Sequence, residues 1–293
     1  FISGVFGIYI ARVLGPEDKG ILSIALSTCG LMAMLFSFGV PYAAAYYIRS
    51  HPGSQSFILA QTNRTMIICG ILSFLLVLFG KDFFSSVFLG GKVIDASMVV
   101  VLVGMVIVNS LNLIVGATLV AQGGAKGFAV STNTGTLVCV VSTLFLLWHC
   151  ESRLHAVLFG ILLGAACSTF MMRIHYLDSA KEGSEGLHTV TSMNFFSYGI
   201  QAQAGALASL VFKRIYFFII SYFINTSAVG LYSVGIGLRD LAMTVSSAFA
   251  GLAGGEMADP DNRANRKAEN IFRKGVIFNI ISSIIFFLGA VIV

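Results

Sequence analysis

Long apolar segments alternate with short polar ones along the whole chain. Most apolar segments run for roughly 20 residues or more, which is the length that a helix needs to cross ~30 Å of hydrocarbon. None shows the strict alternation over ~10-residue segments that is typical of an outer-membrane barrel. The pattern therefore predicts an all-α, polytopic transmembrane helical bundle.

The polar turns divide the chain into about nine predicted spans. These cover residues 1–14, 21–48, 54–80, 96–122, 128–149, 156–176, 192–224 and 231–256, with a last span starting near 276. Gly15 and Pro16 mark the first break, and a loop with an aromatic centre is predicted at 81–95. The sequence begins without a methionine and ends inside an apolar run. We therefore expect a fragment with a truncated first helix and further helices missing at its C-terminal end.

A polar stretch at 178–191, which contains Gly183 and Gly186, separates the sixth predicted span from the seventh. We predict that it is a cytoplasmic linker between two lobes. Residues 1–177 would form a first six-helix lobe, and residues 192–293 would contain the first three helices of a second lobe.

A weak internal repeat supports this division. Sliding the chain by 210 residues places Ile10, Gly20, Ser23 and Leu31 on Ile220, Gly230, Ser233 and Leu241. The shared layout is stronger evidence, because each copy has a long apolar helix that breaks, at Gly15 or Asn225, five residues before a glycine in the next span. Transporters are often built from such repeats, with the substrate site between them. The sequence therefore predicts a two-lobed 6+6 transporter with an incomplete second lobe.

The composition agrees with a membrane protein. Hydrophobic residues make up 57% of the chain and charged residues 11%, with a mean hydropathy of +0.89, whereas soluble domains have roughly 25% charged residues. The net charge of +5 bears on orientation, because short cytoplasmic loops hold the excess of Lys and Arg. The even-numbered loops and adjoining helix ends hold ten such residues: Arg49, Arg64, Lys126, Arg173, Lys181, Arg263, Arg266, Lys267, Arg273 and Lys274. The odd-numbered loops hold four, Lys19, Lys81, Lys92 and Arg153, so we predict that the even loops are cytoplasmic.

Four basic residues remain inside predicted spans: Arg12, Lys213, Arg214 and Arg239. An ionisable side chain near the middle of a membrane costs several kcal/mol unless it faces water, a partner or a ligand. If the seventh helix ends outside at Asn225, Lys213 lies ~18 Å deep. We predict that Lys213 and Arg214 face a water-filled cavity, with snorkelling to a helix end and a structural ion pair as the alternatives.

Arg239 is predicted ~13 Å deep on the next helix, directly before Asp240. Adjacent residues point about 100° apart on a helix, so we do not expect these two to form a good pair. A cavity position and an interhelical ion pair both remain open for Arg239. Arg12, one turn before Gly15, and Arg64 fit structural or interfacial roles better than direct contact with a ligand.

The sequence shows no pattern for metal binding or catalysis. The five cysteines are scattered without a Cys-x-x-Cys pair, and no histidine stands at ligand spacing. The histidines near span ends have no acidic pattern around them, and no long loop presents an acid/base pair or a nucleophile. We predict no catalytic residue, no metal, no cofactor and no nucleic-acid partner.

Two stretches resemble a known family. The residues IARVLGPEDKG at 10–20 resemble the opening signature of bacterial polysaccharide (oligosaccharide-lipid) flippases, and VGLYS at 229–233 resembles the motif that opens their eighth helix. These flippases belong to the multidrug/oligosaccharidyl-lipid/polysaccharide exporter superfamily. The resemblance covers essentially the whole chain. It implies a secondary transporter of the bacterial cytoplasmic (inner) membrane, with two six-helix bundles around a central cavity.

The resemblance also implies a substrate. A flippase of this kind moves a polyprenyl-pyrophosphate-linked oligosaccharide repeat unit from the inner to the outer leaflet for cell-surface polysaccharide biosynthesis, with cationic cavity residues on its anionic head. The amides of Asn109 and Asn112 share a helix face and would contact sugar hydroxyls, unless they bridge helices by hydrogen bonds. The substrate-binding candidates are therefore Lys213, Arg214, Arg239, Arg12, Arg64, Asn109 and Asn112. The lipid bilayer, a coupling ion (H⁺ or Na⁺) and polysaccharide polymerase machinery complete the partners considered.

Two other function classes remain as alternatives. A cation-coupled small-molecule exporter of the same superfamily would need buried carboxylates, and Asp240 alone fits that need. Many relatives carry an acidic residue where this chain has Lys213, so coupling through an acidic group at that position is not carried over. A membrane glycosyltransferase, polymerase or acyltransferase would need the catalytic groups that the loops lack.

The charge count makes a topological prediction. We expect the region around Ser184 to be cytoplasmic and Ser227 to be external. On a background without native cysteines, an impermeant thiol reagent applied from outside should label Ser227→Cys and not Ser184→Cys. The reverse labelling pattern would overturn the predicted orientation.

Overall fold

The structure, a computed structural model, describes residues 2–50, 55–88, 96–150, 152–180, 192–240, 273, 275–277 and 280. These residues are helical apart from short turns, and no strand occurs among them, which confirms the all-α prediction. The helices are α1 (Ile2–Phe36), α2 (Val40–Ser50), α3 (Gln55–Phe88), α4 (Ala96–Ala121), α5 (Ala125–His149), α6 (Arg153–Ala180) and α7 (Ser192–Phe223), followed by a helix at 226–240. Five stretches within them are long and apolar enough to cross a membrane: Phe6–Phe36, Ser97–Ala121, Ala125–His149, Arg153–Leu177 and Ser192–Phe223. The chain is therefore a multi-pass membrane protein.

The predicted spans agree best with α4, α5 and α6, where short polar turns mark the helix ends. The prediction of a loop from 81 is wrong, because α3 continues to Phe88. Most of the predicted linker at 178–191, the end of the eighth span and most of the ninth lie outside the described residues. Residues 10–231 form one compact unit, and residues 1–9 with 232–293 form another. The division into two six-helix lobes stays a prediction.

The predicted break at Gly15 is present as a kink inside α1. Gly15 has φ 74° and ψ 175°, which lies outside the helical region, and Pro16 begins the next helical segment. Proline suits the first position of a helix, because its missing N–H would have no partner there. The break also frees carbonyl groups at the end of the preceding segment. Arg153 at the start of α6 donates a hydrogen bond from Nη1 to the Val13 carbonyl, at 3.0 Å.

A second break separates α1 from α2 at 37–39, so the predicted span over 21–48 is not one continuous helix. Phe38 and Gly39 both have positive φ, 47° and 75°. Ser37 closes the end of α1 by donating a hydrogen bond from Oγ to the Met34 carbonyl, at 2.7 Å. A Cβ atom on Gly39 would overlap the backbone of Gly199, so this turn lies directly against α7.

A third break follows α7, 210 residues after the first. Asn225 caps the helix at 226–240, because its Oδ1 accepts a hydrogen bond from the Ala228 N–H at 2.8 Å. A Cβ on Gly20 would overlap the Thr226 carbonyl oxygen, and one on Gly230 would overlap the Pro16 carbonyl oxygen. Thr226 lies 210 residues after Pro16, and Gly230 lies 210 residues after Gly20. The contact is therefore reciprocal, as at a two-fold axis.

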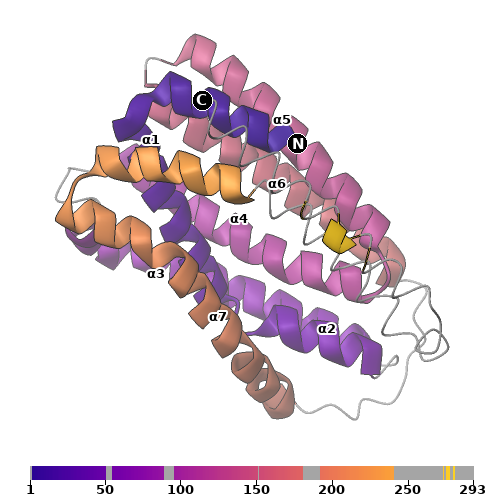
Figure 1. The fold of residues 1–293 in the computed structure, drawn as a ribbon. Coiled ribbons are helices and arrows are strands. Elements are labelled where there is room, and N and C mark those ends of the chain that lie inside the picture. The colour runs from indigo at the N-terminus through magenta and orange to yellow at the C-terminus, as the bar shows by residue number, and fades with distance from the viewer. Residues whose placement is uncertain are drawn as a thin grey trace. The chain divides into compact units, whose positions relative to one another are not determined.

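Within residues 10–231, α4 is the central helix and contacts α2, α3, α5 and α6. Figure 1 shows α5 and α6 running side by side, and α7 packs on α2. A buried cluster joins four helices through Val40, Ala43, Ala44, Ile48, Ile58, Ile114 and Phe195. Small residues set the helix spacing: a Cβ on Gly135 would lie 2.5 Å from the Ser168 Cβ and 2.7 Å from the Gly164 carbonyl oxygen.

Hydroxyl side chains inside the spans bond to their own helix. Ser27 and Thr28 donate to the carbonyls four residues earlier, at 2.7 and 2.9 Å, and Ser23 does the same at 2.9 Å. This pattern lets a polar side chain lie in hydrocarbon without an unpaired donor. The polar residues of α1 are therefore compatible with a membrane span.

The close approach of α5 and α6 predicts a stability effect. A Cβ on Gly164 would lie 2.5 Å from the Cys139 Cβ and 2.6 Å from the Gly135 carbonyl oxygen. We expect Gly164→Ala to destabilise the protein by about 1–3 kcal/mol through overpacking, seen as a lower Tm in detergent. Gly70→Ala on α3, where nothing lies within 4 Å of an added Cβ, is the matched control and should leave the Tm unchanged or raise it. An equal Tm for the two variants would contradict this account of the packing.

Candidate functional site

A cavity of about 620 Å³ lies inside the unit formed by residues 10–231. Cavities of this size hold small ligands or part of a larger one. The lining comes from α1, the turn after it, α2, α4, α6 and α7. Its fifteen residues are Leu26, Gly30, Ala33, Met34, Ser37, Pro41, Tyr42, Asn109, Asn112, Leu113, Ile161, Ala206, Ser209, Leu210 and Lys213. None of them is acidic, so the charge on this lining is positive.

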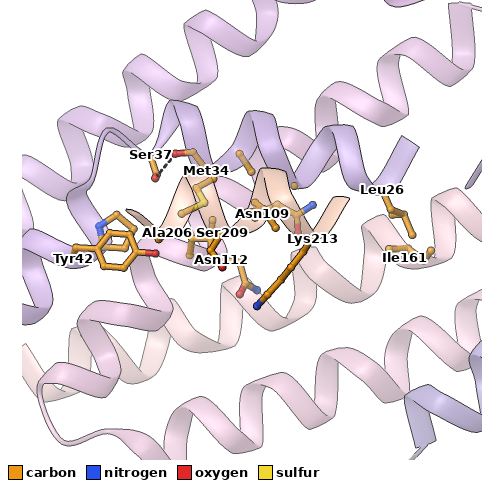
Figure 2. Close-up of a pocket in the computed structure, with 15 residues that line it drawn as sticks. Leu26, Met34, Ser37, Tyr42, Asn109, Asn112, Ile161, Ala206, Ser209 and Lys213 are labelled. Atoms are coloured by element: carbon orange, nitrogen blue, oxygen red, sulfur yellow. Dashed lines mark hydrogen bonds between the residues drawn. The ribbon is translucent and has the colours of Figure 1, made fainter. Parts of the chain in front are cut away.

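The polar groups of the lining lie between its two ends. Figure 2 shows Tyr42 at one end and Leu26 with Ile161 at the other, with the two asparagines, Ser209 and Lys213 between them. Apolar walls with a few polar groups are the usual make-up of a ligand pocket. The arrangement offers one cation and several neutral hydrogen-bonding groups to a ligand.

One face of α7 supplies its part of the wall. Ala206, Ser209, Leu210 and Lys213 follow the spacing of residues on one helix face. Lys213 is exposed and has no carboxylate partner among the described residues. Lys213 therefore lies on the wall of the cavity.

Arg214 does not line this cavity. Adjacent residues point about 100° apart on a helix, and the Arg214 guanidinium lies 5.8 Å from the centroid of the Phe217 ring. That distance is typical of a cation–π contact. The two cations that the sequence suggested as a unit are thus separated.

The other predicted cations have different surroundings. Arg12 and Arg64 are exposed and are not among the lining residues. The expectation that Arg239 and Asp240 would not pair is wrong: Arg239 Nη2 lies 2.8 Å and Nε 3.2 Å from Asp240 Oδ1. Their side chains are 47% and 50% exposed, which leaves the long arginine side chain room to bend back to its neighbour.

The two asparagines of α4 differ in their partners. Asn112 Nδ2 donates to Ser168 Oγ at 3.4 Å and to Thr169 Oγ1 at 3.3 Å on α6. Asn109 makes no side-chain hydrogen bond in the part of the chain that the structure describes. Both side chains line the cavity. Asn112 therefore bridges helices as well, while the Asn109 amide is available to a ligand.

Sequence reasoning missed several groups. Ser37 and Tyr42 line the cavity because of the break at 37–39. Gly39 and Pro41 mark this break in the sequence, but they stand in an otherwise apolar run of helical length. Arg173 was counted as a loop charge, yet its Nη2 donates to Asn63 Oδ1 at 2.7 Å. Its guanidinium also lies 5.9 Å from the Tyr176 ring centroid. This arginine joins α3 to α6.

Comparison with known proteins identifies the family. Residues 1–253 match the family described as polysaccharide biosynthesis protein. The chain belongs to this family. The match confirms the resemblance to polysaccharide flippases, and members of the polysaccharide biosynthesis protein family are typically transporter-like rather than catalytic. No curated protein and no solved structure matches the chain.

The different partners of the asparagines lead to a prediction. Asn112→Ala should lower the Tm in detergent, because it removes an interhelical hydrogen bond worth about 0.6–1.7 kcal/mol. Asn109→Ala, three residues away on the same helix, should leave the Tm unchanged. If Asn109→Ala proves the more destabilising of the two, the assignment of the bridging role to Asn112 is wrong.

Proposed function

We propose that the protein is a flippase that moves polyprenyl-pyrophosphate-linked oligosaccharide from the inner to the outer leaflet, for cell-surface polysaccharide biosynthesis in a bacterial cytoplasmic membrane. The observation that carries the proposal is a cavity with one lysine and no acidic residue in its lining. A cation without a carboxylate partner at membrane depth is costly unless an anion or water compensates it. A pyrophosphate supplies that anion.

The neutral groups of the lining support the same substrate. The Lys213 ammonium acts as a point charge that attracts phosphate oxygens from several directions. The Asn109 amide and the Ser209 hydroxyl can exchange hydrogen bonds with sugar hydroxyls. One cavity thus combines an anion site with groups suited to an oligosaccharide.

The reciprocal contact at Gly20 and Gly230 supports a transport mechanism. In our proposal the two repeats rock against each other about the substrate site. The contact lies at the predicted outer ends of the helices, so it would close the outer side while the cavity faces the cytoplasm. Separating the helices that start at Pro16 and Thr226 would then open the outer side.

The main alternative is a cation-coupled small-molecule exporter that uses H⁺ or Na⁺. Such a protein needs a carboxylate at its ion site, and the lining of the described cavity has none. Asp240 already holds Arg239. The acid-free lining therefore favours the flippase, with a coupling ion and polymerase machinery as further partners to be tested.

Lys213 provides the test. We expect Lys213→Gln to slow flipping of a fluorescent lipid-linked oligosaccharide in proteoliposomes about tenfold or more, since the neutral amide cannot replace a charge-assisted hydrogen bond. Lys213→Arg should retain most activity. The Tm of Lys213→Gln should stay near wild type, because its removal leaves no buried partner unpaired.

Arg64→Gln is the matched control, because Arg64 is basic, exposed and outside the lining. It should flip at the wild-type rate. Wild-type flipping by Lys213→Gln would contradict the anion role of Lys213. Absence of flipping by the wild-type protein would contradict the proposed function itself.

A further inference from the structure

Three tyrosines lie exposed on α2 and α7 next to the cavity. Tyr42 is 37% exposed, Tyr46 47% and Tyr198 38%. Tyr42 lines the cavity. Tyr46 follows it by four residues, which places both rings on one face of α2, roughly 6 Å apart along the helix axis.

Tyr198 lies on the side of α7 that faces the cavity. Tyr198 precedes Ser209 by eleven residues, close to three full turns, so the two share a helix face, and Ser209 lines the cavity. The Tyr46 and Tyr198 rings stack, with centroids 4.5 Å apart and an interplanar angle of 27°. The stacked pair therefore extends the cavity wall on both helices toward the end of α2, which is cytoplasmic in the predicted topology.

Tyr47 and Phe195 hold the stacked rings of Tyr46 and Tyr198 in place. Tyr47 packs edge-on against Tyr46, with ring centroids 5.1 Å apart, and against Tyr198 at 6.1 Å. Tyr47 in turn lies 5.7 Å from the ring of Phe195, which is fully buried. The backbone of α7 meets the turn before α2 at the residue after Tyr198, where a Cβ on Gly199 would lie 2.7 Å from the Gly39 carbonyl oxygen. Rings fixed in this way lose little further freedom when a ligand binds.

Exposed aromatic rings beside neutral amides and hydroxyls have a specific chemical use. A pyranose ring presents a face of C–H groups that packs on an aromatic ring, while its hydroxyls project from the edge and need hydrogen-bond partners. Tyr42, Tyr46 and Tyr198 offer the rings, each with a hydroxyl of its own. Asn109 and Ser209 offer further partners on the same side of the molecule. A lipid-facing aromatic belt would not include a ring that lines the cavity, as Tyr42 does.

We propose that Tyr42, Tyr46 and Tyr198, here called the tyrosine platform, bind the sugar rings of the substrate by stacking, separately from the anion site at Lys213. This inference rests on the proposed function, because it assigns the oligosaccharide part of that substrate to its own subsite. The lipid-linked oligosaccharide enters with its sugars on the platform and its pyrophosphate near Lys213.

Two ligands separate the platform from the anion site. One is the lipid-linked oligosaccharide pool extracted from producing cells, and the other is polyprenyl pyrophosphate that carries no sugar. The reporter is Tyr46→Trp in a Trp148→Phe background, since Trp148 is the single native tryptophan and is 89% exposed at the end of α5. The sugar-bearing lipid should change the emission of the new tryptophan, and the sugar-free lipid should not.

The second part of the test measures the affinities of variants without the tryptophan reporter for the same two ligands. We expect Tyr46→Ala and Tyr198→Ala each to weaken binding of the sugar-bearing lipid about tenfold and to leave binding of the sugar-free lipid unchanged. Tyr46→Phe and Tyr198→Phe keep the rings and should keep most of the affinity. Tyr222→Ala, an exposed tyrosine at the other end of α7, is the control and should bind both ligands like wild type.

Three results would overturn the platform. Unchanged affinity of the alanine variants for the sugar-bearing lipid would remove its role in binding. An equal loss for both ligands would show a general effect on the fold, which the Tm would register. If the wild-type protein binds neither ligand, the proposed function fails, and the platform fails with it.

Discussion

Every backbone N–H and C=O group inside a bilayer must find a partner within the protein, and this requirement governs where the helices of this chain can break. Three of the described breaks, at Gly15, at 37–39 and at Asn225, have such partners. Arg153 bonds the Val13 carbonyl beside the first, Ser37 closes the second, and Asn225 caps the helix after the third. Each break is thus tolerated because a side chain replaces a lost helical bond. The second break turns Ser37 and Tyr42 into the cavity, so the site depends on it.

Glycine-mediated contacts determine the helix spacing around the site. Where backbones touch, at Gly39 with Gly199 and at Gly135 with Gly164, no side chain fits between the helices. Gln203, buried on α7, donates a hydrogen bond to the Met34 carbonyl near the break at 37–39. Tyr42 follows the contact at Gly39 within one turn, whereas Lys213 lies about three to four turns beyond the contacts of Gly199 and Gln203.

Much of the fold could be predicted from the sequence, because polar turns such as the one before Ala125 interrupt apolar runs of helical length. The break at 37–39 was not predicted, because Gly39 and Pro41 stand in an otherwise apolar run and the contact of Gly39 with Gly199 joins residues far apart in the sequence. Lys213 could be singled out from the sequence, because a lysine deep in an apolar run costs several kcal/mol unless it faces water, a partner or a ligand. Arg214, the next residue, points about 100° away from Lys213 around the helix and does not line the cavity. Depth in the membrane, obtained by counting residues along the helix, does not distinguish the two. The sequence did not indicate the proposed sugar-binding role of Tyr46 and Tyr198, because an aromatic residue in an apolar run is equally typical of a buried core position.

The reciprocal approach of Gly20 and Gly230 restricts which substitutions the two positions can share. In most tight contacts, a larger residue on one side can be accommodated by a smaller one opposite. Here an added Cβ meets a main-chain carbonyl, of Thr226 or of Pro16, and the residue opposite is already glycine. No second substitution at the partner position can restore the space. Each glycine is therefore required independently, and a suppressor of a change at either site must act by moving a whole helix.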